Sequence, residues 1–230
     1  MRVLLIDDER LARAELRRLL AAHPHVSIVG EAVSAADGVQ QIAALKPDLV
    51  FLDVQMPGGS GFDMLAALDE APAVIFTTAF DQYAVQAFEV NALDYLQKPI
   101  QPARMAAALQ RHARQPDVQA PGPKKLFIRD GERCWFVAID DIRLFESEGN
   151  YTRVYCADQQ PLMLRSLSQL EEKLDPARFF RANRRHLVNL DFIDHVQAND
   201  AGGFTLTLAG GVQGEVSRRR AAQFRELATL

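Results

Sequence analysis

The stretch Asp48-Leu49-Val50-Phe51-Leu52-Asp53 is an apolar run that ends in a carboxylate. A second run, Val3-Leu4-Leu5-Ile6, ends in the pair Asp7-Asp8. Short runs of this kind predict buried strands, and parallel strands bring their carboxyl ends to one edge of a sheet. The three carboxylates would then raise one another's pKa unless a cation neutralised them. Because hard divalent ions prefer carboxylate oxygens, the arrangement predicts a magnesium site.

Two further strand-like runs end in groups suited to a phosphoryl group. The run Val74-Ile75-Phe76-Thr77-Thr78 supplies hydroxyls, and Tyr95-Leu96-Gln97-Lys98 supplies an ammonium. Open α/β sheets place their sites at the carboxyl ends of the strands, so both runs are expected to join the acidic cluster. The Lys98-Pro99 bond is a candidate cis peptide, because proline lowers the cost of the cis form.

From residue 1 to about 114, strand-like runs alternate with runs of helical spacing. The predicted strands are Val3–Ile6, Val26–Val33, Leu49–Asp53, Val74–Thr78 and Asp94–Gln97. The predicted helices are Leu11–Leu20, Ala35–Leu45, Phe62–Leu68, Tyr83–Val90 and Met105–His112. Five successive strand and helix units predict a doubly wound parallel sheet, the flavodoxin-like (βα)5 arrangement, with helices on both faces.

The pattern changes after residues 115–123, which hold three prolines and a glycine without periodicity and predict a semi-extended linker. Residues 124–230 are expected to be mainly β. The strand candidates are Phe127–Arg129, Cys134–Ala138, Arg143–Glu146, Thr152–Cys156, Leu162–Leu164, His186–Asn189, Phe192–Gln197, Phe204–Leu208 and Val212–Val216. Only Ser166–Leu174 and Arg218–Leu227 have helical spacing. The predicted domains are therefore residues 1–114 and 124–230.

Composition narrows the class of protein. No apolar run approaches the roughly 20 residues that a membrane helix needs, so no membrane segment is expected. The amino terminus turns acidic at Asp7, too early for a signal peptide, and we expect a cytoplasmic protein. The two cysteines, Cys134 and Cys156, are too few for a disulfide framework and are expected in the core.

Charge is distributed unevenly along the chain. Residues 1–116 hold ten Lys and Arg against fourteen Asp and Glu, whereas residues 124–230 hold sixteen against fifteen. The arginines of the second half are bunched, at Arg178, Arg181, Arg184 and Arg185 and in the triplet 218–220. Local patches of this kind suit a polyanion, although arginines that pair with Glu171 and Glu172 or lie solvated on a helix would give the same pattern.

With Asp7-Asp8, Asp53, Thr78-Ala79, Tyr95 and Lys98-Pro99 on five successive units, residues 1–114 resemble the receiver domain of bacterial response regulators. The resemblance implies that Asp53 accepts phosphate from a sensor histidine kinase. It implies that Asp8 binds Mg²⁺ directly, that Asp7 holds it through water, and that the Gln55 carbonyl completes the protein ligands. Lys98 would then pair with the phosphoryl oxygens. The Thr78 hydroxyl would move toward those oxygens, and Tyr95 would report the movement to the outer face.

Three motifs of the second half, Ile139–Val154, Phe179–Asn189 and Val216–Arg220, resemble the LytTR DNA-binding domain, whose contacts come from loops between strands. Carried onto this chain, the contacts fall on Asn150, Tyr151, Thr152, Arg153, Arg184, Arg185, Arg218 and Arg219. Independently, Arg can read guanine or phosphate, Asn can read adenine, and Thr can touch the thymine methyl. The family commonly has Cys-His where this chain has Ala182-Asn183, so the base contacts there stay open.

The sequence thus predicts a transcription regulator rather than an enzyme. Phosphorylation is expected to favour a homodimer through the face of the fourth helix, fifth strand and fifth helix, roughly residues 82–112, and two copies would bind repeated half-sites. A receiver-gated protein-interaction or RNA-binding module is the alternative. An aspartate-nucleophile phosphatase is disfavoured, because it needs a second carboxylate where this chain has Gln55.

Overall fold

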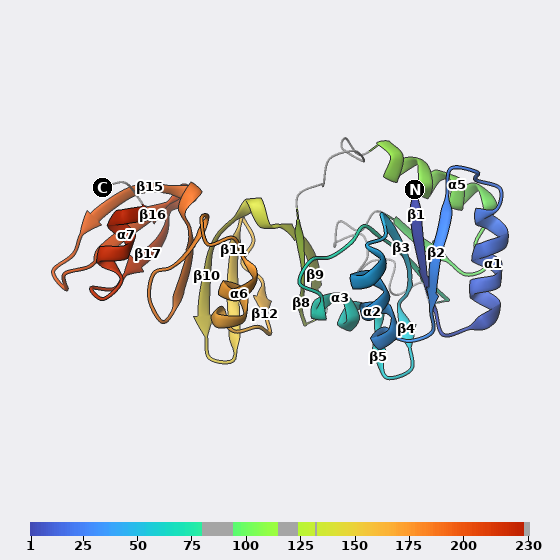
Figure 1. The fold of residues 1–230 in the computed structure, drawn as a ribbon, viewed down its shortest axis with the longest axis horizontal. Helices are drawn as coiled ribbons and strands as arrows, with labels where there is room; N and C mark the ends of the chain where they lie inside the picture. Colours follow the sequence, from blue (N-terminus) through green and yellow to red (C-terminus); the bar gives the residue numbers. More distant parts are fainter. Residues whose placement is uncertain (80–93, 115–123, 132, 228–230) are drawn as a thin grey trace. The chain divides into compact units, whose positions relative to one another are not determined.

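The five strands predicted for the first half form one parallel sheet in the order β2-β1-β3-β6-β7 (Figure 1). The computed structural model describes residues 1–79, 94–114, 124–131 and 133–227, and its contacts divide the chain into two units, Met1–Phe136 and Val137–Leu230. The strands are β1 (Arg2–Ile6), β2 (Ser27–Ala32), β3 (Leu49–Asp53), β6 (Val74–Thr78) and β7 (Asp94–Gln97). The central strand β3 pairs with β1 on one side and β6 on the other, and all its residues are buried.

The described helices cover both faces of this sheet, as predicted. They are α1 (Arg10–Leu20), α2 (Ala35–Leu45), α3 (Gly61–Ala67) and α5 (Pro102–Arg114). Alternate residues of β1 point to opposite faces. Val3 and Leu5 pack with α1 and α5, and Leu4 and Ile6 pack with α2 and α3. Figure 1 shows these helices around the sheet. The helix predicted at Tyr83–Val90 lies outside the described residues, as do residues 115–123 of the predicted linker.

The hairpin of β8 (Lys125–Asp130) and β9 (Arg133–Ala138) packs against α3 of the first unit. The ring of Phe127 lies parallel to that of Phe62, with centroids 6.3 Å apart, and edge-on to that of Phe136 at 5.0 Å. An isolated two-stranded hairpin is marginal in water, so this packing supplies its apolar partner. The sequence had placed residues 124–138 in the second domain, whereas the contacts divide the chain after Phe136.

Replacing Phe127 with Ala is therefore expected to destabilise the first unit. Phe127 is 2% exposed, and truncating a buried phenylalanine typically costs about 3–5 kcal/mol. Urea unfolding of a fragment of residues 1–138 measures the loss, and Arg133→Ala on the exposed side of the same hairpin is the control. A fragment ending at residue 114 should unfold at lower urea than the longer one. Equal midpoints for the two variants would contradict the packing role.

The second unit is mainly β, as predicted, with two antiparallel sheets. Their orders are β12-β11-β10-β14-β13 and β15-β16-β17. The strands are β10 (Ile142–Glu148), β11 (Tyr151–Cys156), β12 (Leu162–Met163), β13 (Phe179–Arg181), β14 (His186–Asn189), β15 (Ile193–Ala198), β16 (Phe204–Leu208) and β17 (Val212–Val216). Short 3-10 turns span Ile139–Asp141, Leu190–Phe192 and Ala209–Gly211.

Two helices complete this unit, α6 (Leu167–Lys173) and α7 (Ala221–Leu227). Phe224 of α7 is fully buried and packs against Phe180 and Phe204, so the helix closes the core between strands of both sheets. The helix predicted from Arg218 begins three residues later, because the Arg220 N–H donates to the Ser217 carbonyl and forms a turn. Among the described helices, none is long and apolar enough to cross a membrane.

Candidate functional site

The three carboxylates at the ends of β1 and β3 come together as the sequence predicts. One oxygen each of Asp7, Asp8 and Asp53 lies within 4.8 Å of the other two. Asp7 is fully buried, Asp53 is 5% exposed, and Asp8 is partly exposed. Three hard oxygen donors at this spacing, with one side open, suit a divalent ion such as Mg²⁺, which keeps several of its waters when bound by protein carboxylates.

Lys98 reaches this cluster from the end of β7. Its Nζ lies 2.8 Å from Asp7 Oδ2 and 3.2 Å from Asp53 Oδ2, so the ammonium bridges the two carboxylates. The Lys98 N–H donates to the Thr78 carbonyl at 2.8 Å, and the Lys98-Pro99 peptide is cis, as expected. Burial acts to lower the Lys98 pKa, but the hydrogen bond to Asp7 and the charges of Asp53 and Asp7 outweigh it and hold the pKa above its ordinary value.

Two other residues of the predicted site are buried around it. Thr78 ends β6 beside the cluster and is 1% exposed. Tyr95 of β7 is 7% exposed and packs in the same core cluster as Phe76, so its ring faces inward in this structure. The main chain of Gln55 approaches the acceptor as well, because its N–H donates to Asp53 Oδ1 at 3.4 Å, while its side chain is exposed.

The loop after Asp53 is shaped by glycine and a capping box. A short pair, β4 (Gln55–Met56) with β5 (Gly59–Ser60), leads into α3, where the Ser60 and Asp63 side chains cap each other's backbone. A Cβ at Gly61 would lie 2.4 Å from the Asp53 carbonyl oxygen, which is backbone and cannot yield. Glycine at this position therefore lets α3 begin directly beside the acceptor.

Burial dominates the electrostatics of Asp53 and raises its pKa from 3.8 to about 6. The Lys98 ammonium acts to lower the pKa, and the Asp7 carboxylate acts to raise it. The folded chain therefore binds a proton at Asp53 more tightly than the unfolded chain does. Ionised Asp53 destabilises the metal-free fold, and the destabilisation is complete above pH 6 and disappears as the pH falls from 6 to 3.8.

It follows that Asp53→Asn should stabilise the metal-free protein at neutral pH. We expect a gain of about 1–3 kcal/mol in the free energy of unfolding, at about 1.4 kcal/mol per pKa unit, shrinking toward zero near pH 4. Urea unfolding of the first unit in a chelator, at a series of pH values, measures the difference. Added Mg²⁺ should stabilise the wild type more than the variant, because the variant lacks one ligand. A variant less stable than the wild type at pH 7.5 would refute the conclusion that ionised Asp53 destabilises the metal-free fold.

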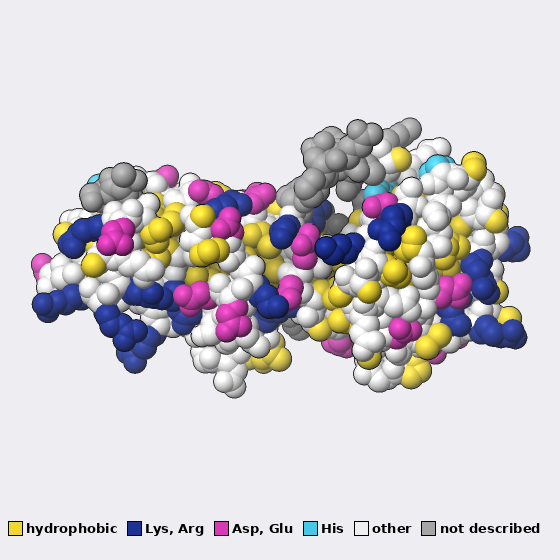
Figure 2. All heavy atoms as spheres, viewed as in Figure 1, with side chains coloured by type: hydrophobic (Ala, Val, Ile, Leu, Met, Phe, Trp, Pro, Cys, Tyr) yellow, Lys and Arg dark blue, Asp and Glu magenta, His cyan; other side chains and the backbone are white. Residues whose placement is uncertain are grey.

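Two of the three predicted DNA-contacting segments meet at a cleft of the second unit. Arg184 and Arg185 lie between β13 and β14, and Arg218 and Arg219 lie between β17 and α7. All four line a cleft of about 1290 Å³. Figure 2 shows dark-blue side chains gathered on this unit. Among the described residues, the side chains of Arg184, Arg218 and Arg219 make no ion pair, so their guanidinium groups remain available to an anion.

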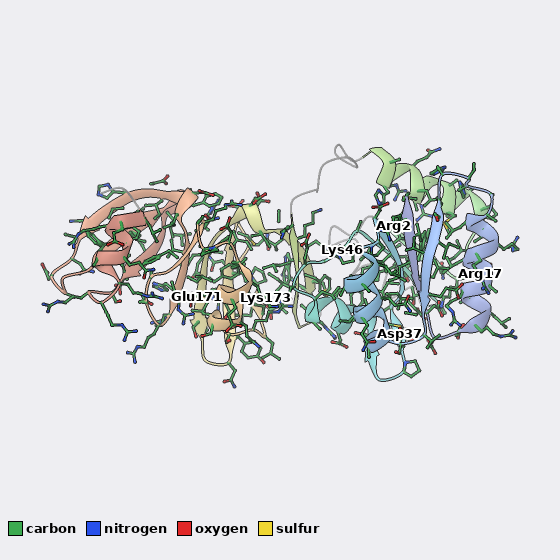
Figure 3. The ribbon with its side chains drawn as sticks, viewed as in Figure 1. Arg2, Arg17, Asp37, Lys46, Glu171 and Lys173 are labelled. Carbon is green, nitrogen blue, oxygen red and sulfur yellow. The ribbon has the colours of Figure 1, made fainter. Side chains whose placement is uncertain are left out.

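Other arginines of the cleft are already paired, and so is Arg178, which lies outside the cleft lining. Glu171 of α6 is labelled in Figure 3. Its Oε2 lies 3.6 Å from Arg181 Nη1, and its Oε1 lies 3.3 Å from Arg220 Nη2. Glu146 of β10 lies 2.7 Å from Arg185 Nη2 and accepts the Tyr155 hydroxyl at 2.7 Å. Arg178 pairs with Asp140 and Asp191 rather than with a glutamate. These ion pairs give the paired arginines local structural roles. The sequence allowed for such pairing as the alternative to binding a polyanion.

The first predicted segment lies apart from the lining of the cleft, at the β10–β11 turn. Asn150 and Tyr151 are exposed there. Arg153 pairs with Glu148 through two contacts, Nε to Oε1 at 2.5 Å and Nη2 to Oε2 at 2.7 Å. Thr152 is 1% exposed and its hydroxyl donates to the Arg165 carbonyl, so it cannot touch a thymine methyl as expected. We correct this assignment: Thr152 is a core residue.

The comparisons with known proteins match both halves of the chain. Residues 3–110 match the family model of the response regulator receiver domain, and residues 132–229 match that of the LytTr DNA-binding domain. Together these matches cover most of the chain, in the order that the sequence predicts. The chain therefore belongs to the two-component response regulators that join a receiver to a LytTR DNA-binding domain, and it is a transcriptional regulator of that type.

Relatives of full length carry related descriptions. An uncharacterized response regulatory protein of Vibrio cholerae is 38% identical over 97% of each chain. The sensory transduction protein LytT of Enterococcus faecalis is 34% identical over 98% of each chain, and so is the transcriptional regulatory protein BtsR of Escherichia coli.

Solved structures resemble one half of the chain each. The response regulatory domain of MrkE from Klebsiella pneumoniae is 34% identical with a TM-score of 0.45, and covers 49% of this chain and 95% of that one. A LytTr domain from Bacillus cereus is 22% identical with a TM-score of 0.44, and covers 46% of this chain and 97% of that one.

Proposed function

We propose that Asp53 accepts a phosphoryl group from a sensor histidine kinase and that this modification controls binding of duplex DNA by the second unit. The observation that carries the proposal is the contact of Asp53 with Lys98 beside Asp7 and Asp8, at the carboxyl end of the central strand. A strand-end carboxylate faces the open edge of the sheet, where an incoming phosphoryl group can approach it.

The residues around Asp53 have separate roles in this proposal. Asp7, Asp8, Asp53 and the Gln55 carbonyl would hold Mg²⁺, which neutralises phosphoryl oxygens when it is bound. The Asp53 carboxylate must be ionised to attack phosphorus, and the nearby ammonium of Lys98 favours its ionised form. Once Asp53 carries the phosphoryl group, Lys98 would pair with the new oxygens and Thr78 would donate its hydroxyl to them. Tyr95 would change position with Thr78.

The proposed output is a homodimer on repeated half-sites. Its face, roughly residues 82–112, lies partly outside the described residues. Within the described part, Asp94 of β7 pairs with Arg104 at 3.4 Å and with Arg111 at 2.7 Å, both on α5. Two tethered copies would bind two half-sites with a raised effective concentration. We propose a cytoplasmic location, where a chromosomal target is accessible. We also propose domain limits of 1–114 and 124–230 with a linker between them, in which the β8–β9 hairpin at the start of the second domain packs on α3 as part of the first compact unit.

Two other functions would give different experimental results. A receiver-gated protein-interaction or RNA-binding module would have the same first unit but no preference among duplex DNA sequences. A phosphatase would need a general acid two residues after Asp53, and the exposed amide of Gln55 cannot transfer that proton. We therefore propose that the chain does not hydrolyse external phosphoesters. The only phosphate it would release is its own, slowly, from Asp53.

The test is selection of genomic DNA fragments by the full chain, with and without acetyl phosphate and Mg²⁺. Enrichment of fragments that share a repeated sequence, increased by the phosphoryl donor, supports the proposal. Competition with unrelated duplex and with RNA separates it from the interaction module. Recovery of fragments without any shared sequence, under both conditions, contradicts it.

A further inference from the structure

Two loops carry the arginines of the cleft, one between β13 and β14 and the other between β17 and α7. Hydrogen bonds join these two arginine loops, and most of the bonds involve Asn183 or His186. The Asn183 Nδ2 donates to the Glu215 carbonyl at 2.7 Å, and the Glu215 N–H donates to His186 Nδ1 at 3.1 Å. The Ser217 N–H donates to the Ala182 carbonyl at 3.0 Å. The loop between β13 and β14 is thus tied to the end of β17 at three points.

Both the oxygen and the nitrogen of the Asn183 side-chain amide are hydrogen-bonded within the protein. Its Oδ1 accepts from the N–H groups of Arg185 at 2.6 Å and His186 at 2.9 Å. Its Nδ2 donates to Glu215 and lies 3.2 Å from His186 Nδ1. An amide oxygen has two lone pairs, and both are taken by these backbone N–H groups, so the oxygen of Asn183 cannot also accept from a base.

The same network assigns the tautomer of His186. A backbone N–H can only donate, so the Nδ1 that faces Glu215 must be the acceptor and the ring proton lies on Nε2. Nε2 lies 3.5 Å from the Oε1 of Glu146, the carboxylate that also holds Arg185. His186 therefore touches both loops of the cleft and the central strand β10.

The arginines themselves cannot hold the loops together. Arg184, Arg218 and Arg219 are exposed, and like charges on two adjacent loops repel each other. The spacing of the two loops is set instead by neutral hydrogen bonds beneath them. Loops fixed before binding do not pay the ordering cost when a ligand arrives.

We propose that Asn183 and His186 are positioning residues that hold the two arginine loops in one arrangement, so that both meet a single DNA duplex. The inference rests on the proposed binding of DNA and assigns neither residue a contact with a base. Each acts through the arginines above it.

Two substitutions of His186 separate the role of its two nitrogens. The amide oxygen of Asn occupies roughly the place of Nδ1, whereas the longer Gln reaches roughly the place of Nε2. In the full chain, we expect His186→Gln to weaken binding of the selected DNA about tenfold, the equivalent of about one lost hydrogen bond. His186→Asn should retain most of the affinity, because it can still accept from the Glu215 N–H.

A double-mutant cycle tests Asn183 independently. We expect Asn183→Ala to weaken binding about tenfold on all sequences alike, and the loss to shrink when Arg219→Ala is already present. Ser166→Ala is the control, because it also removes a side-chain oxygen that accepts from a backbone N–H, that of Gln169 at 3.2 Å, but lies outside the cleft lining. It should reduce stability and leave affinity unchanged. Circular dichroism confirms that each variant is folded.

The possible outcomes are distinct. A wild-type chain without sequence-specific binding defeats the proposed function before any variant is compared. Wild-type binding that survives both Asn183→Ala and His186→Gln overturns the positioning role alone. So does strict additivity with Arg219→Ala, and so does loss of discrimination at one base pair in Asn183→Ala, which would make Asn183 a base reader.

Discussion

Asp53→Asn is expected to gain no phosphate when the chain is incubated with Mg²⁺ and acetyl phosphate, whereas the wild type should gain one acid-labile phosphate per chain. The variant has no carboxylate to form the acyl phosphate, and no other carboxylate of the cluster replaces it. Asp7 is fully buried and its Oδ2 contacts Lys98, and Asp8 belongs to the proposed metal ligands. Intact-mass measurement of both proteins gives the result directly.

The control is Asp48→Asn, the same change at the residue just before the opposite end of β3. Asp48 Oδ2 accepts the Arg2 N–H at 2.6 Å and lies away from the cluster, so phosphate uptake should be unchanged. Asp8→Ala should lose uptake through metal affinity. Lys98→Ala should still bind the metal ion, but metal binding should no longer lead to a change in DNA binding. Phosphate retained by Asp53→Asn would refute the acceptor assignment.

The acidic site was predictable because short-range patterns determine it. Each of its residues ends or follows a strand, and a parallel sheet brings strand ends to one edge regardless of side-chain detail. The bridging position of Lys98 between Asp7 and Asp53 was not predictable, since it depends on the separation of β1, β3 and β7 in the folded sheet. The sequence places Lys98 at the edge of the sheet that holds the acidic cluster, without specifying which carboxylates it contacts.

The burial of Thr152, the pairing of Arg153 and the packing of Phe127 were not predicted, each for a different reason. Thr152, Val154 and Cys156 alternate along β11 and are all buried, so the period-two pattern already indicated that Thr152 faces the core. The pairing of Arg153 with Glu148 depends on the register of a hairpin, which residue spacing alone does not specify. The packing of Phe127 on Phe62 is a contact between segments far apart in the chain, and no local signal predicts it.

The largest effect expected on DNA binding is from Arg219→Ala. Its side chain is exposed on the cleft and has no ion-pair partner among the described residues, so its guanidinium group can bind a base or a phosphate without first breaking a contact. We expect a loss of about 1–3 kcal/mol on the selected sequence. Loss confined to one base pair identifies a base contact. A uniform loss with a salt slope reduced by about one identifies a phosphate contact.

Two comparison variants make this result specific to the cleft. Arg153→Ala should weaken binding less than Arg219→Ala, because Arg153 must first leave Glu148 before it can bind DNA. Arg225 of α7 lies over the Phe204 ring at 5.1 Å and is absent from the cleft lining, so Arg225→Ala should leave affinity unchanged. If all three variants weaken binding equally at every salt concentration, the effect is one of total charge. The two loops of the cleft would then not be the surface that reads DNA.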